Sequence, residues 1–309
     1  MLNHKCNLIV DSCCDLPYAM LNREGVELLK FPYIMSDGDH LDDMYTSLEP
    51  HAFYESIRKG EAPSTAQISM PTLLSAFNNA AASGVPTVFL CFSSGLSGTY
   101  DTACMALDQV KSEHPDAELY IVDTKLASIA EGMLVAEALR QRDNGLTAEE
   151  LVAWAEEAVY YVGCLFMVED LDSLARGGRL PSVGAYLGSK LDVKPMVSFD
   201  LEGHLSMAGV SRGRKKGIRQ LAEAFEKNAV KEPGVRHALI AHADCPKDCA
   251  KLKEMLLKSD PELLIIESNI GPVIGCHVGP GMIACVYWGE DRRKSLSLAD
   301  RIAKRVKGE

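Results

Sequence analysis

One stretch of the chain indicates its fold most directly: Thr87-Val-Phe-Leu-Cys-Phe-Ser-Ser-Gly-Leu-Ser-Gly-Thr-Tyr100. The first six residues form a short apolar run without charges, as is typical of a strand that is buried on both faces of a sheet. A loop of serines and glycines follows, and a helix is predicted from about residue 100 to residue 110. A buried strand joined to a helix in this way is the repeating unit of a parallel α/β sheet.

The same unit occurs twice more in the first half of the chain. The apolar run Asn7-Leu-Ile-Val10 leads into Asp11-Ser-Cys-Cys-Asp15 and a predicted helix opened by Leu16-Pro17. The run Leu119-Tyr-Ile-Val122 leads into Asp123-Thr-Lys125 and a predicted helix over residues 127–140. In an open parallel sheet, ligands bind beyond the carboxyl ends of the strands, so all three polar loops are expected to lie at a ligand site.

The second half of the chain has a different pattern. Short apolar runs and turns alternate with amphipathic segments, which predicts strands at residues 162–167, 194–199, 205–210, 236–241, 263–267 and 283–288 and helices at residues 183–191, 214–228 and 247–258. This mixture of hairpins and helices is typical of a two-layer α/β domain with a mixed sheet. We therefore predict an α/β protein of two domains, residues 1–160 and residues 161–309.

The composition excludes several classes of protein. The 309 residues carry a net charge of −11, whereas general binding to nucleic acid or to an anionic membrane needs a basic surface. A local basic patch and transient membrane contact remain open. No signal peptide is visible, and the uncharged residues 62–100 are interrupted by prolines and glycines, which a transmembrane helix would not be. They are predicted to be two loops and a helix packed in the interior.

The ten cysteines include no Cys-x-x-Cys pair and suit a reducing compartment, so a cytoplasmic protein is expected. Cys245-x-x-x-Cys249 has no second pair of ligands nearby, as a zinc site would need. Residues 34–41 are predicted to form a hairpin, and the acidic residues around it lack the spacing of a calcium loop: Asp37, Asp39, Asp42 and Asp43. They are predicted to belong to a solvated turn, and no metal and no cofactor are expected.

The uncharged stretch contains two candidate ligand-binding segments. Ser64 and Thr65 precede a helix, and exposed amides and hydroxyls at a helix start can hold an anion. Ser93, Ser94 and Gly95 follow a buried strand, and glycine lets the backbone approach a ligand closely. Neither segment is a P-loop or a dinucleotide-binding loop. An anion held without Lys or Arg is more consistent with a single carboxylate than with a triphosphate.

A histidine and two basic segments complete the candidates. His277 lies in the glycine-rich stretch 271–281, which is predicted to be a loop, and it is either a structural residue or a ligand-binding residue. Two basic segments stand out on this acidic chain: Arg176 with Arg179, and Arg212 with Arg214 and Lys215. Each segment is either charge that flanks a helix, or a docking surface for an acidic partner or a phosphate.

Six stretches in register resemble the DegV family. They are Val10-Asp-Ser-Cys-Cys-Asp-Leu-Pro17, Pro63-Ser-Thr-Ala-Gln-Ile-Ser69, Phe92-Ser-Ser-Gly-Leu-Ser-Gly-Thr-Tyr100, Asp123-Thr-Lys-Leu-Ala-Ser128, Leu174-Ala-Arg-Gly-Gly-Arg179 and residues 270–281. Each is weak alone, but six in order along most of the chain are specific. The resemblance implies a three-layer α/β/α domain with a parallel sheet, then a two-layer α/β domain with a mixed sheet that closes over a long-chain fatty acid.

The resemblance also implies roles for individual residues. The carboxylate of the fatty acid is expected at the hydroxyls of Thr65 and Ser94, with these residues nearby: Ser64, Ser93, the Gly95 amide and His277. The acyl chain is expected in an apolar tunnel along residues 183–191, lined by Val183, Gly184, Leu187 and Gly188.

Some members of the family are similar to the fatty-acid-binding subunit of bacterial fatty acid kinase, which presents its bound acid to a separate kinase. The resemblance therefore implies a lipid-binding protein that performs no chemistry of its own, and the basic segments are expected to dock the kinase. Two alternatives stay open: a lipid sensor without a kinase partner, and a serine hydrolase that uses Ser94 and His277. No carboxylate–histidine pairing for a catalytic triad is evident in the sequence.

Overall fold

The computed structural model describes residues 4–180, 193–232 and 237–295. Its first half is built on a four-stranded sheet, sheet A, in the order β2-β1-β6-β7 with every neighbouring pair parallel. The strands are β1 (Asn7–Asp11), β2 (Val26–Leu29), β6 (Thr87–Cys91) and β7 (Leu119–Asp123). The predicted parallel sheet is confirmed, because the apolar runs that precede the polar loops are its strands β1, β6 and β7.

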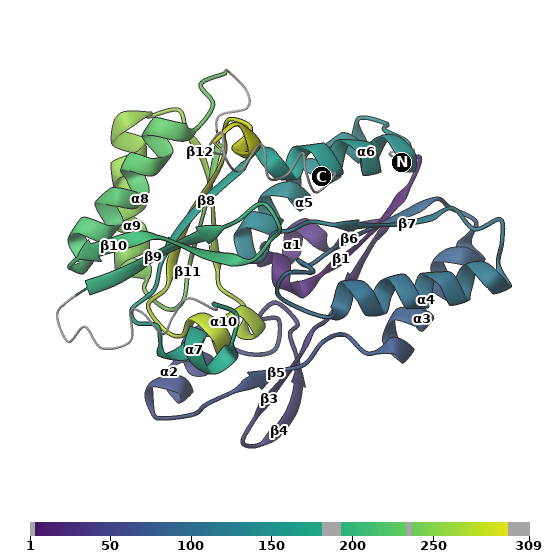
Figure 1. Ribbon diagram of the computed structural model, residues 1–309, viewed down its shortest axis with the longest axis horizontal. Coiled ribbons are helices and arrows are strands. Elements are labelled where there is room, and N and C mark those ends of the chain that lie inside the picture. The colour runs from purple at the N-terminus through teal and green to yellow at the C-terminus, as the bar shows by residue number, and fades with distance from the viewer. Residues whose placement is uncertain (1–3, 181–192, 233–236, 296–309) are drawn as a thin grey trace, which may run out of the picture.

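Helices cover both faces of sheet A (Figure 1). α3 (Met70–Ser83) and α4 (Thr99–Glu113) pack against each other on one face, and α5 (Ser128–Asp143) and α6 (Ala148–Ala158) lie on the other. The short elements η1 (Ser12–Cys14) and α1 (Tyr18–Leu21) connect β1 to β2, and η2 (Val159–Tyr161) follows α6. The expected three layers are therefore present.

The interior packing predicted for the helix in residues 62–100 is wrong. This helix, α3, buries only Leu73, Ala76 and Phe77, so it lies on the outside of sheet A with its opposite face in solvent. The lack of charge in this stretch does not reflect burial, because small residues and neutral polar residues form the exposed face of the helix.

The second half of the chain forms a six-stranded sheet, sheet C, in the order β10-β9-β8-β13-β11-β12. Only the β11–β12 pair is parallel, which confirms the predicted mixed sheet. The strands are β8 (Val162–Met167), β9 (Val193–Phe199), β10 (Leu205–Arg212), β11 (His237–His242), β12 (Leu264–Asn269) and β13 (Ile283–Trp288). α8 (Arg214–Asn228) and α9 (Pro246–Ser259) pack on one face, and η4 (Arg292–Ser295) follows the last strand.

α5 joins the two halves of the molecule. It contacts β8, β11 and β13 of sheet C, and also η1 and α6 of the first half. Most of its side chains are buried, from Ser128 at its start to Arg142 near its end, and its sequence has no marked polar face. A helix that is buried on all sides needs no such face.

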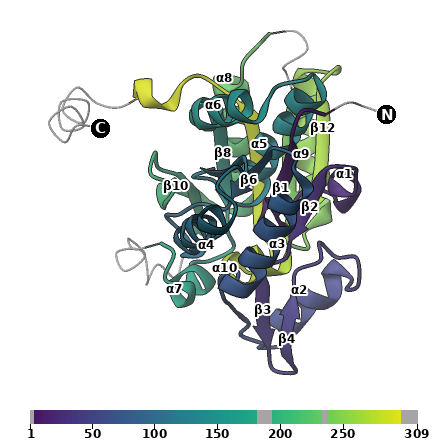
Figure 2. The same ribbon diagram turned by 90° about the vertical axis from the view of Figure 1, so that its right-hand side faces the viewer.

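A small antiparallel sheet, in the order β4-β3-β5, lies at one end of the molecule (Figure 2). Its strands are β3 (Pro32–Met35), β4 (Gly38–Leu41) and β5 (Ser64–Thr65), and α2 (Pro50–Arg58) lies between β4 and β5 in the chain. The predicted hairpin is present as β3 and β4. The prediction that these acidic residues belong to a solvated turn is wrong for Asp42. This residue is fully buried, and its Oδ1 accepts a hydrogen bond from the Met44 amide at 2.9 Å.

Two short helices complete the described structure: α7 (Asp172–Gly177) and α10 (Pro272–Val278). The loop predicted over residues 271–281 is therefore wrong over most of its length. Gly275 lies inside α10, where a Cβ would come within 2.7 Å of the Phe53 ring and 2.8 Å of the Tyr54 hydroxyl oxygen. The glycine permits close packing of a helix and does not mark a loop.

Among the helices that the structure describes, none combines the length and the apolar character that a membrane crossing requires. The helix predicted at residues 183–191, together with its tunnel residues Val183, Gly184, Leu187 and Gly188, lies outside the described residues.

Candidate functional site

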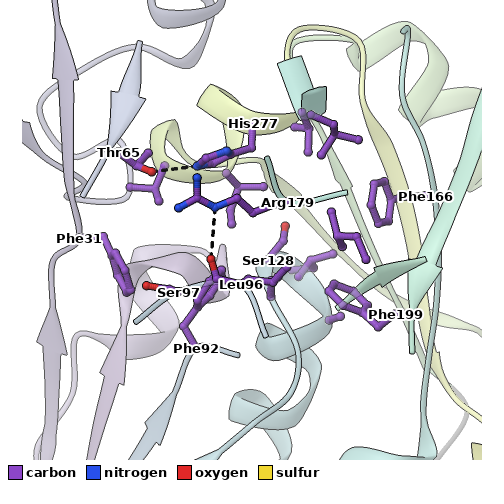
Figure 3. A pocket seen from close by; sticks show the side chains of 18 of the residues that line it. Phe31, Thr65, Phe92, Leu96, Ser97, Ser128, Phe166, Arg179, Phe199 and His277 are labelled. Atoms are coloured by element: carbon purple, nitrogen blue, oxygen red, sulfur yellow. Dashed lines mark hydrogen bonds between the residues drawn. The ribbon is translucent and has the colours of Figure 1, made fainter. Parts of the chain in front are cut away.

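A pocket lies between the two halves, at the carboxyl edge of sheet A, where Phe31 follows β2, Phe92 follows β6 and Ala127 follows β7 (Figure 3). The chain places β2 on one side of β1 and β6 on the other, and ligands of open α/β sheets bind where the strand order reverses in this way. The pocket has a volume of about 150 Å³. Residues of sheet A loops, of the start of α5, of sheet C and of α10 line it.

Asp11 joins the loop that follows β1 to the loop that follows β6. It ends β1, and its carboxylate accepts bonds from the Phe92 amide at 2.8 Å and from the Cys13 amide at 3.1 Å. Burial raises the pKa of Asp11 to about 7, although both amide bonds favour its charged form. The aspartate that follows the first apolar run is thus a scaffold residue, and Phe92 beside it lines the pocket.

Thr65 and His277 meet at the polar end of the pocket. The Thr65 Oγ1 and the His277 Nε2 are 2.8 Å apart although the two residues are 212 positions apart in the chain. The other ring nitrogen, Nδ1, is buried and has no hydrogen-bond partner among the described residues. Burial, with a smaller effect of the nearby Arg179 charge, lowers the pKa of His277 to about 4. The imidazole is therefore neutral at pH 7 in the ligand-free protein.

The Arg176-Gly-Gly-Arg179 turn places a cation beside this pair. A Cβ at Gly177 would lie 2.2 Å from the His277 Nδ1, so glycine lets α7 end against the imidazole. Gly178 has φ 68°, the left-handed conformation that glycine adopts at a helix end. Arg179 then lines the pocket and donates to the carbonyl oxygens of Leu96, at 3.3 Å, and Gly177 (Figure 3). From the sequence, Arg179 was expected to serve partner docking, and no cation was expected at the ligand.

The second hydroxyl segment is placed differently from the first. Ser93 is buried and donates to the Gly203 carbonyl oxygen at 2.9 Å, and Gly95 packs so closely on Gly203 that a Cβ would lie 2.9 Å from its carbonyl carbon. Ser94 is exposed, and its hydroxyl donates to Asp123 at 2.6 Å. None of these three lines the pocket. The close approach that Gly95 permits is to the β9–β10 turn of the other half.

Ser94 and His277 are not hydrogen-bonded to each other. The Ser94 hydroxyl is bonded to Asp123, and the His277 Nε2 is bonded to Thr65. The geometry lacks the serine–histidine contact that a hydrolase would use. Ser64, next to Thr65, is exposed and also lies outside the pocket lining.

Further polar residues line the pocket that were not among the candidates from the sequence: Gln67, Ser97 and Ser128. All three lie in the family stretches quoted above, but the side chains of such loops alternate in direction, and the sequence alone does not say which of them face a ligand. The Ser128 hydroxyl is already used, because it donates to the Asp15 Oδ2 at 2.5 Å.

The opposite end of the pocket is apolar. The lining there comes mainly from sheet C and the first turn of α5: Cys164, Phe166, Phe199, Leu205, Ala284, Ile129 and Ala130. The rings of Phe166 and Phe199 have their centroids 6.3 Å apart. Ligand pockets commonly have volumes of about 300–1,000 Å³, so the cavity that the described residues enclose is small for a ligand pocket.

The remaining residues of the basic segments have varied surroundings. Arg176 is exposed and donates to the Ser173 hydroxyl at 2.9 Å. Arg214 is partly buried and pairs with Asp248 and, at 2.9 Å, with Glu169. Arg212 and Lys215 are exposed.

Comparison with known proteins identifies the family of this chain. The model of the DegV family matches residues 5–290. A DegV domain-containing protein of Clostridium perfringens is 34% identical over 285 residues, which cover 92% of this chain and 98% of that protein. The crystal structure of DegV from Bacillus subtilis, described as a fatty acid binding protein, is 28% identical with a TM-score of 0.79, and the match covers 93% of this chain and 100% of that chain.

A more distant structure has the same fold. The Streptococcus pneumoniae fatty acid kinase B3 protein, loaded with linoleic acid, matches with a TM-score of 0.80 at 21% identity, over 93% of this chain and 100% of that chain. The family match spans both sheets and every residue that lines the pocket. This chain belongs to the DegV family.

Proposed function

We propose that this chain binds a long-chain fatty acid, with the carboxylate at the Thr65–His277 pair and Arg179 and with the acyl chain toward Phe166 and Phe199. The polarity of the pocket carries the proposal: a hydroxyl, an imidazole and a guanidinium lie at one end, and aromatic and aliphatic side chains line the other. The fatty acid binding described for the similar Bacillus subtilis protein supports it.

The hydrogen bond between Thr65 and His277 favours one arrangement of protons. A buried N–H without an acceptor costs more than an unused lone pair, and the His277 Nδ1 has no partner among the described residues. The neutral ring therefore carries its proton on Nε2 and donates it to the Thr65 Oγ1. This leaves the Thr65 hydroxyl proton free to donate to a ligand carboxylate.

Arg179 supplies the charge that the uncharged stretch lacks. Its described hydrogen bonds go to backbone carbonyls of Leu96 and Gly177, which carry no net charge. A carboxylate beside Arg179 would form a charge-assisted bond, which is stronger than a bond between neutral groups. Together Thr65 and Arg179 hold the head group and fix its orientation.

The acyl chain supplies most of the binding free energy, at about 0.8 kcal/mol for each buried methylene. A whole long chain needs more room than the cavity of about 150 Å³. We place the rest of the chain along the proposed tunnel residues, which follow Leu180 in the sequence and lie outside the described range: Val183, Gly184, Leu187 and Gly188. Leu180 itself is buried.

In this arrangement the head group would lie where another protein could reach it. The pocket lining includes the exposed residues Gln67, Gly98 and Arg179, whereas Phe166 and Phe199 are buried. A fatty acid bound in this direction presents its carboxylate at the mouth. We propose that a separate fatty acid kinase phosphorylates it there and docks on Arg176, Arg212 and Lys215, and the shared fold of the linoleic-acid-loaded kinase B3 protein is consistent with this role.

The test begins with the ligand that the purified protein carries. Mass spectrometry of a denaturing extract is expected to show intact C14–C18 fatty acid, and a covalent adduct on Ser94 would instead support the hydrolase. Thr65→Val, nearly isosteric, removes the hydroxyl from the site, and a hydrogen bond to a charged group contributes about 1.5–3 kcal/mol. We expect weaker binding in a fluorescent fatty-acid displacement assay.

Thr72→Val is the matched control, because Thr72 is exposed on α3 and does not line the pocket. Equal affinity of the Thr65 variant, the Thr72 variant and the wild-type chain would remove Thr65 from the head-group site.

A further inference from the structure

Three side chains with metal-binding donors lie together outside the pocket: His242, Cys249 and Glu267. One donor atom of each lies within 4.8 Å of the donor atoms of the other two. His242 ends β11, Cys249 is in the first half of α9, and Glu267 is on β12. The fold therefore gathers them from three elements at one edge of sheet C, and none of them lines the pocket.

The cluster is buried on one side and open on the other. His242 is 7% exposed and Cys249 is 0% exposed, whereas Glu267 is exposed. Lys253 binds the Glu267 Oε2 at 3.3 Å and so restricts that carboxylate. The Cys245 amide donates to the His242 Nδ1 at 3.3 Å, which is long for a hydrogen bond and is the contact that metal coordination would displace.

A divalent ion binds the thiolate form of a cysteine and an unprotonated ring nitrogen of a histidine. Metal binding would form an S–metal bond, break the S–H bond and release one proton to the solvent.

We propose that His242, Cys249 and Glu267 form a zinc site with three protein ligands and a water in the fourth position on the exposed side. A thiolate and an imidazole are donors that zinc prefers, and calcium and magnesium prefer oxygen donors alone. In a tetrahedral zinc site the donor atoms are about 3.5 Å apart, so small changes in side-chain torsions would close this cluster around the ion.

Such an ion would stabilise the base of α10. The His242 carbonyl oxygen accepts a bond from the Ile270 amide at 3.0 Å, and the Ile270 carbonyl oxygen accepts bonds from the hydroxyls of Tyr45 and Tyr54 at 2.8 and 2.6 Å. α10 begins two residues later and carries His277. The ion would therefore act on the position of α10, whereas the observations that support the site do not depend on the proposed fatty-acid binding.

Cobalt(II) is the probe, because a cobalt–thiolate bond gives a charge-transfer absorption band that zinc does not. The full-length protein is treated with a chelator, dialysed and titrated with Co²⁺. We expect a charge-transfer band and tetrahedral visible bands that saturate at one ion per chain, the release of one proton per ion in weak buffer, and loss of the bands when Zn²⁺ is added. Cys249→Ser should remove the charge-transfer band.

Cys245→Ser is the matched control, since Cys245 is close in the chain but is not one of the three clustered residues. It should keep the band. Glu267→Gln changes an exposed residue and should weaken Co²⁺ binding at least tenfold even if Cys249→Ser does not fold. Absence of the band in the wild-type chain, its persistence in Cys249→Ser, or its loss in Cys245→Ser would each overturn the assignment.

Discussion

Gly177→Ala tests the geometry of the head-group site with the smallest change available, one methyl group. Gly177 ends α7, and its Cβ would lie 2.2 Å from the His277 Nδ1. Ordinary contacts between such atoms are about 3.5 Å, so the imidazole must move by about 1 Å or more.

The magnitude follows from the bond that this movement breaks. The Thr65 Oγ1 and His277 Nε2 are 2.8 Å apart, and we expect a shift of about 1 Å in the ring to distort or break this hydrogen bond. The Thr65 hydroxyl then loses the partner that directs its proton toward the carboxylate. If the bond to the charged ligand is lost, the cost is about 1.5–3 kcal/mol, which is a roughly 10- to 150-fold weaker affinity.

The protein itself should stay folded. Gly177 has no left-handed backbone conformation, and alanine is the better helix former by about 1 kcal/mol, which partly offsets the displaced ring. Gly178→Ala is the complementary control, because Gly178 has φ 68° and a methyl group added there would have nothing within 4 Å of it. It should lower the free energy of unfolding by about 1 kcal/mol and leave binding unchanged.

The assay is displacement of a fluorescent fatty acid, together with urea denaturation of each variant. The two variants should show opposite patterns: weaker binding at nearly unchanged stability for Gly177→Ala, and lower stability at unchanged binding for Gly178→Ala. Wild-type affinity of a folded Gly177→Ala protein would refute the reasoning, because the imidazole could then move without consequence for the ligand.

Three further predictions concern the docking surface, the histidine and a buried carboxyl group. Arg212→Glu combined with Lys215→Glu should leave fatty acid bound but abolish its phosphorylation by the kinase through slower association, whereas loss of ligand would place these residues at the pocket. The pKa of His277, about 4 without ligand, should rise when a carboxylate binds, so affinity increases as the pH falls through the bound-state value and is constant above it; an NMR titration that is insensitive to ligand would make His277 purely structural. Burial raises the pKa of Asp42 to about 7, so the folded state holds this proton more tightly than the unfolded state, and the free energy of unfolding falls as the pH rises from about 4 to about 7. Asp42→Asn should therefore stabilise the protein more at pH 8 than at pH 5 in urea denaturation, and an equal gain at both values would contradict the shift.

Three strands of sheet A, β1, β6 and β7, were predictable because their signal is local, whereas the edge strand β2, which is largely not buried, was not predicted. Runs such as Thr87–Cys91 are apolar at every position after the first, and only a strand covered on both faces needs such a run. The pairing of Thr65 with His277 is not local, and it was expected only from the family resemblance. No spacing rule connects two residues that β5 and α10 bring together.

The errors arise where a residue type has more than one physical use. Glycine at 275 and 95 permits close packing against Tyr54 and against Gly203, and the sequence does not distinguish such packing from a ligand-binding loop. Arginine at 179 follows a glycine turn that directs it into the pocket, whereas the charge of its segment alone suggested a docking surface. The proposed zinc site could not be predicted from the sequence for a similar reason. His242 and Glu267 become neighbours of Cys249 only when β11 and β12 pair.

The contacts between the two halves determine how a ligand can enter. Asp15 of the first half accepts a bond from the Gly271 amide at 2.8 Å, and its carbonyl oxygen accepts one from the Ser268 hydroxyl. The Ser93 hydroxyl also joins the two halves, because it donates to the Gly203 carbonyl oxygen at 2.9 Å. None of these residues lines the pocket, so the bonds hold the halves together without closing the exposed mouth beside Arg179. In the proposed arrangement the fatty acid would enter this mouth with its tail first, and its carboxylate would stay near the surface.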